Sequence, residues 1–85
     1  MANLTDLPNI GAVAAEALKQ VGGETPEQLR EIGAQEAWLR IRTQVDHGSC
    51  LHMLQGLEGA VEGIRKSQLS PEKKAELKEF FDRFQ

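Results

Sequence analysis

The residues best suited to nucleophile or metal chemistry are His47, Cys50 and His52, which lie close together in the sequence. A Cys–His pair can act as a nucleophile with its base, and three such side chains could begin a zinc site. A structural zinc site takes four ligands, however, and the chain contains no further Cys or His. Cys50 also starts an apolar helical pattern. We therefore interpret it as a small buried hydrophobic residue, and we predict no catalytic residue, metal or cofactor.

Other signatures of an enzyme are missing from the sequence. There is no glycine-rich phosphate loop, cofactor fingerprint or acid–base pair in a plausible cleft. A helical domain of 85 residues also has little room for a deep pocket. These observations favour a non-enzymatic protein that acts by binding.

The basic residues form three groups that could contact phosphate or an acidic partner: Arg40 with Arg42, Arg65 with Lys66, and the set Lys73, Lys74 and Lys78. The other interpretation is solvated helix surface, because acidic residues alternate with these cations. The net charge of −3 and the isoelectric point near 5.3 argue against nucleic-acid binding by bulk charge. They leave a local contact open.

The length of 85 residues predicts one small domain, over residues 1–85. One cysteine allows no internal disulfide and suggests a reducing compartment. The chain does not open on an export signal, and no apolar run approaches the ~20 residues of a membrane helix. We expect a soluble cytoplasmic protein without membrane contact.

One stretch, from Ser49 to Ile64, organises the rest of the chain. Its large apolar residues recur at helical spacing, and Ser49 is expected to cap the helix. Gly56, Gly59 and Gly63 fall on a second line, although each interior glycine costs about 1 kcal/mol relative to alanine. Close approach of another backbone would explain them. That backbone could belong to a helix of the same chain or to a second subunit.

Four further helices are predicted around this central one. The first follows a turn at 7–11 and ends at Gly22–Gly23, and the second starts with a Thr25–Gln28 capping box. The third spans about 34–45, and the last starts at Ser70–Pro71. The residues expected to face the core in these helices are Ile10, Val13, Ala14, Ala17, Leu18, Val21, Leu29, Ile32, Ala34, Ala37, Trp38, Ile41, Val45, Leu77, Phe80, Phe81 and Phe84.

Phe80 and Phe81 raise the possibility of an interface. Consecutive residues on a helix point about 100° apart, so one core need not cover both rings. An interface at these rings or along the glycine line would make the protein an adaptor or a homodimer.

The order of several motifs resembles the C-terminal domain of the TfoX family. They are Leu7-Pro-Asn-Ile-Gly11, Thr25-Pro-Glu-Gln-Leu-Arg-Glu-Ile-Gly-Ala34, Glu36-Ala-Trp-Leu-Arg40, Leu57-Glu-Gly-Ala-Val-Glu-Gly-Ile-Arg65, and Leu69 through Phe81. TfoX proteins are bacterial regulators of competence for DNA uptake. The resemblance implies a compact all-α domain that works in a regulatory setting, and the sequence pattern predicts five helices for it.

The first of these motifs also resembles a helix-hairpin-helix, whose usual hairpin is Leu-Pro-Gly-Ile-Gly. Such hairpins bind DNA phosphate through backbone N–H groups. Asn9 replaces the first hairpin glycine, and asparagine tolerates a positive φ. The resemblance therefore implies a weak, non-specific nucleic-acid contact. The residues that would carry it are Asn9, Ile10, Gly11, Lys19, Arg40 and Arg42.

Two functions follow from these patterns. The leading one is a regulatory binding module that contacts nucleic-acid phosphate through the hairpin at 7–11. The alternative is a protein–protein adaptor or homodimer without nucleic-acid binding. The positions of the cations decide between them: cations on the face of the hairpin favour nucleic acid, and scattered cations favour the adaptor.

Overall fold

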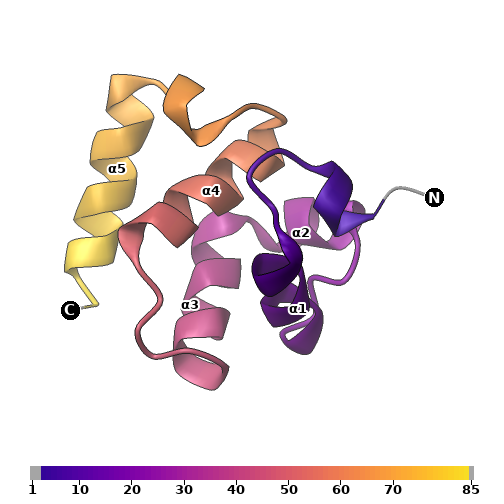
Figure 1. Ribbon diagram of the computed structural model, residues 1–85. Coiled ribbons are helices and arrows are strands. Elements are labelled where there is room, and N and C mark those ends of the chain that lie inside the picture. The colour runs from indigo at the N-terminus through magenta and orange to yellow at the C-terminus, as the bar shows by residue number, and fades with distance from the viewer. Residues whose placement is uncertain (1–2, 85) are drawn as a thin grey trace.

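The computed structural model describes residues 3–84, which form an all-α fold (Figure 1). Its five α-helices are α1 (Ala12–Gln20), α2 (Pro26–Ile32), α3 (Ala34–Gln44), α4 (Leu51–Glu62) and α5 (Pro71–Asp82), and single 3₁₀ turns form η1 (Leu4–Asp6) and η2 (Lys66–Gln68). Helix α4 lies between α5 on one side and α1 and α2 on the other. The predicted fold class is confirmed.

Two of the predicted helix starts are present in atomic detail. The Thr25 hydroxyl accepts a hydrogen bond from the Gln28 N–H at 3.1 Å, and the Gln28 carboxamide accepts one from the Thr25 N–H at 3.3 Å. The Ser70 hydroxyl accepts from the Lys73 N–H at 3.1 Å. Pro26 and Pro71 occupy the first helical turn, where the missing N–H has no cost.

The start of α4 differs from the prediction. Cys50 rather than Ser49 is the N-cap residue, and its side chain makes no capping bond. Ser49 is buried one position earlier, and its hydroxyl has no hydrogen-bond partner among residues 3–84. Cys50 is exposed, so its prediction as a buried hydrophobic residue is wrong. As the N-cap, Cys50 has an extended backbone, with φ −102° and ψ 173°, so the helical periodicity that predicted its burial does not apply to it.

The fully buried Trp38 lies at the centre of the contact between α3 and α5. Its ring centroid is 5.9 Å from that of Phe80 and 5.5 Å from that of Phe81. Both phenylalanines are half-buried, because the wide indole takes both rings at once. Both rings thus pack against one core, and each keeps part of its surface exposed.

The three glycines of α4 have different roles. Gly56 and Gly59 are buried and approached by Asn9, a residue of the turn at 7–11 rather than of another helix. Gly63 is exposed, has a φ of +79° and ends α4 as its C-cap, with nothing within 4 Å of a Cβ built there. The packing role predicted for Gly63 is thus replaced by helix termination, which favours glycine because of the left-handed backbone.

Candidate functional site

The hairpin at 7–11 is held against the end of α4 by the Asn9 side chain. Asn9 has a φ of +69°, as the sequence predicted it could. Its carboxamide nitrogen donates to the carbonyl oxygens of Gly56 at 3.3 Å and Ile64 at 3.0 Å. Its carboxamide oxygen accepts from the Lys66 N–H at 3.0 Å. The side chain predicted to contact a ligand thus holds the fold together, and only the hairpin backbone is left for phosphate.

A hollow of about 440 Å³ lies beside this hairpin, at the first turn of α1. Lys66 and His52 line it together with Cys50 and Met53. The first N–H groups of α1 have no partner within the helix, and the helix dipole makes this end electropositive. The sequence did not predict this position of Lys66, because no local spacing indicates that the fold brings Lys66 next to the hairpin.

The other cations predicted for nucleic-acid binding lie elsewhere. Lys19 is in the last turn of α1, about 10 Å along the axis from its start. It shares a separate hollow with Glu16 and Glu24. The structure therefore does not bring Lys19 to the hairpin.

The side chains of Arg40 and Arg42 bind two different parts of their own domain. The Arg40 Nε pairs with the Glu36 carboxylate at 3.0 Å, and its Nη1 donates to the Val21 carbonyl at 3.1 Å. Arg42 lies over the Trp38 ring, 5.4 Å from the centroid, and donates to the Phe84 carbonyl. One guanidinium thus supports the end of α1 and the other the end of α5.

An apolar groove is present where α1, the end of α3 and the start of α4 meet. Val13, predicted to face the core, is 81% exposed, and Val45 is 37% exposed. Both line this groove of about 450 Å³ together with Met53. The helical pattern correctly identified the apolar side of α1. It could not show that the neighbouring elements leave Val13 uncovered.

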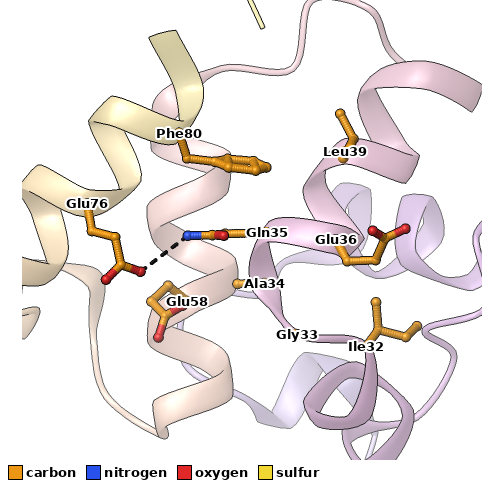
Figure 2. Close-up of a pocket in the computed structure, with 9 residues that line it drawn as sticks. All are labelled: Ile32, Gly33, Ala34, Gln35, Glu36, Leu39, Glu58, Glu76 and Phe80. Atoms are coloured by element: carbon orange, nitrogen blue, oxygen red, sulfur yellow. Dashed lines mark hydrogen bonds between the residues drawn. The ribbon is translucent and has the colours of Figure 1, made fainter. Parts of the chain in front are cut away.

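Figure 2 shows another pocket, between α3, α4 and α5, whose character is acidic. Glu58 and Glu76 line it, and the Gln35 carboxamide donates to the Glu76 carboxylate at 3.3 Å. Lys73 pairs with Glu76 at 3.1 Å, which raises the Lys73 pKa. Burial, followed by a hydrogen bond that the protonated Glu58 carboxyl donates to Glu62, raises the pKa of Glu58 to about 7, against a smaller lowering by Lys73.

The raised pKa of Glu58 predicts a pH-dependent stability. The folded state keeps a proton that the unfolded chain loses between about pH 4.5 and 7, so the free energy of unfolding falls as the pH rises through this range. Solvent screening limits the effect to about 1 kcal/mol. Glu58→Gln is expected to remove most of this fall, measured by urea unfolding at pH 5 and 7.5. Glu31→Gln, at an exposed site on α2, is the control; equal slopes in wild type and Glu58→Gln would contradict the prediction.

Metal and membrane signatures are also missing from the described part of the chain. Among residues 3–84, no group of three His, Cys, Asp or Glu side chains is arranged to hold a metal ion. No helix formed by these residues is both long enough and apolar enough to cross a bilayer.

Comparison with known proteins identifies similar sequences and structures. Protein Sxy of Escherichia coli (strain K12) is 37% identical over 79 residues, which make up 93% of this chain and 37% of Sxy. The chain thus spans little more than a third of that relative. Two solved structures of Listeria monocytogenes proteins, one described as uncharacterized and one of unknown function, both superpose with a TM-score of 0.94.

The first Listeria structure is 46% identical and is aligned over 96% of this chain and 92% of its own. The second is 44% identical, over 98% of this chain and all of its own. The sequence model of the TfoX C-terminal domain matches residues 1–81. Together with the five-helix fold, this match shows that the chain belongs to the TfoX C-terminal domain family.

Proposed function

We propose that this chain is a regulatory binding module whose partner is a protein rather than a nucleic acid. The TfoX assignment and the similarity to Sxy support the regulatory setting. The observation that most favours a protein partner is that the predicted cations are scattered over the domain. Arg40 and Arg42 are bonded to carbonyls at the ends of two different helices, and Lys19 lies beside Glu16 and Glu24.

The net charge of the chain also favours a protein partner over a nucleic acid. Affinity for nucleic acid grows with the number of phosphates that Lys and Arg neutralise together. Of the predicted cations, Lys19, Arg40 and Arg42 do not line the hollow beside the hairpin, and the net charge of −3 repels a polyanion at long range. An acidic surface instead favours encounters with basic proteins.

A second candidate is a local phosphate contact at the hairpin. The observation that favours it is the hollow at the first turn of α1, where Lys66 and His52 join unpaired backbone N–H groups. One or two such contacts would give weak binding, without the steep salt dependence of a basic nucleic-acid-binding domain.

Titration of a fluorescent DNA duplex with the protein distinguishes the two candidates. Non-specific DNA-binding proteins have dissociation constants of roughly 10⁻⁴–10⁻⁶ M. We expect no saturable change in anisotropy at up to about 100 µM protein, even at about 50 mM salt. Binding that weakens with added salt and is lost in Lys66→Glu, but not in the control Lys74→Glu, would overturn the protein-partner proposal and establish the phosphate contact.

A further inference from the structure

The apolar groove between α1 and α3 exposes apolar side chains that residues 3–84 do not cover. Single exposed apolar side chains are ordinary on soluble proteins. Here Val13, Val45 and Met53 come from three different segments and surround one hollow of about 450 Å³. Val13 is 81% exposed although it belongs to the apolar periodicity of α1. Apolar side chains grouped in this way indicate an interaction surface.

The groove is lined by apolar side chains from α1, α3 and α4. It is formed where two helices and the start of a third meet, and its volume lies within the roughly 300–1,000 Å³ of clefts that bind ligands. An amphipathic helix presents apolar side chains at i, i+3 or i+4, and i+7, and these can enter such a groove from one face.

The charges of the groove select among possible occupants. The ionisable residues of its lining are Glu16 and Asp46, both acidic, and the chain as a whole is acidic. A symmetric contact with a second copy would bring these carboxylates against the same carboxylates of the copy. A partner with Lys or Arg beside its apolar residues would neutralise them instead.

We propose that this groove binds an amphipathic helix of a partner protein whose apolar face is flanked by basic residues. This inference rests on the proposed function and adds to it the place of binding and the chemistry of the partner. Glu16 and Asp46 select the charge of the helix, and Val13, Val45 and Met53 receive its apolar side chains.

Two synthetic peptides of equal length test this proposal. Both carry leucine at i, i+3 and i+7, and they differ only in lysine or glutamate at the flanking positions. We expect the lysine peptide to shift the NMR methyl signals of Val13, Val45 and Met53 in a saturable way. The glutamate peptide is expected to bind at least about tenfold more weakly.

Substitutions then separate the apolar contribution from the charge contribution. Val13→Ser should weaken binding of the lysine peptide about tenfold, since burial of a valine side chain is lost. Ala75→Ser, at an exposed site on α5, is the matched control and should leave binding unchanged. Glu16→Lys combined with Asp46→Asn should reverse the preference between the peptides. Asparagine keeps an acceptor for the Gly48 N–H, which the Asp46 carboxylate binds at 2.9 Å.

Each contrary outcome has a distinct meaning. The inference would be overturned if neither peptide bound, or if both peptides bound equally well. Concentration-dependent shifts of the same methyl groups in the protein alone would assign the groove to a second copy and overturn the proposed occupant. The peptide experiments test only where and what the groove binds. The DNA titration separately tests the choice of a protein partner over a nucleic acid.

Discussion

A Gly59→Ala variant is expected to lose about 2–3 kcal/mol of its free energy of unfolding. A Cβ at this position would overlap the Asn9 side-chain nitrogen and would lie 2.7 Å from the Ile64 carbonyl oxygen and 3.2 Å from the Lys66 backbone nitrogen. Two of these atoms are backbone and cannot move aside cheaply. Overpacking of this kind outweighs the ~1 kcal/mol that alanine adds through helix propensity. Urea unfolding followed by circular dichroism measures the difference.

Gly56→Ala is the matched control one turn earlier in α4. Its added Cβ would lie 3.5 Å from the Asn9 Cβ, an ordinary contact, so the gain in helix propensity should leave it neutral or up to about 1 kcal/mol more stable. An Asn9→Gly background should reduce the cost of Gly59→Ala, because one of the overlapping groups is removed. Equal losses in Gly56→Ala and Gly59→Ala would contradict the close packing seen at Gly59.

These glycines show what the sequence can and cannot predict. Their cost in a helix correctly indicated a close approach at Gly56 and Gly59. At both glycines the approaching groups include Asn9, a residue of the turn at 7–11 whose side chain is held by hydrogen bonds to residues about 50 positions away. At Gly59, backbone atoms of Ile64 and Lys66 approach as well. Local spacing carries no information about such a contact. Gly63 looked the same in the sequence, but its left-handed backbone ends the helix.

Local chemistry predicted the helix starts at Thr25 and Ser70, since capping depends on residues within one turn. The burial of Trp38 also followed from its place on an apolar helix face. The candidate site was predicted less well. Whether Val13 is covered depends on a neighbour that helical periodicity does not describe. The roles of Arg40 and Arg42 depend on carbonyls of Val21 and Phe84, which only the tertiary fold brings near.

Replacement of Trp38 by alanine is expected to lower the free energy of unfolding by about 3–5 kcal/mol, a large share of the total. A domain of 85 residues has a total stability of roughly 4–13 kcal/mol. The indole contacts the rings of Phe80, Phe81 and Phe84, and its N–H donates to the Cys50 carbonyl at 3.2 Å. Its loss therefore opens a cavity between α3 and α5 and removes one of the two hydrogen bonds to the Cys50 carbonyl, which still accepts from the Leu54 N–H at 3.3 Å.

Trp38→Phe separates these two contributions. Phenylalanine keeps an aromatic ring against α5 but lacks the donor to Cys50, so this variant should lose a smaller amount, about 1–2 kcal/mol. Phe84→Ala removes a partly exposed ring of the same cluster and should cost less than Trp38→Ala, since much of that ring already faces solvent. Thermal melts followed by circular dichroism compare the three variants. A Trp38→Ala melting temperature equal to that of wild type would show that α5 is held by other contacts, because loss of the indole removes every aromatic contact between α3 and α5 described above.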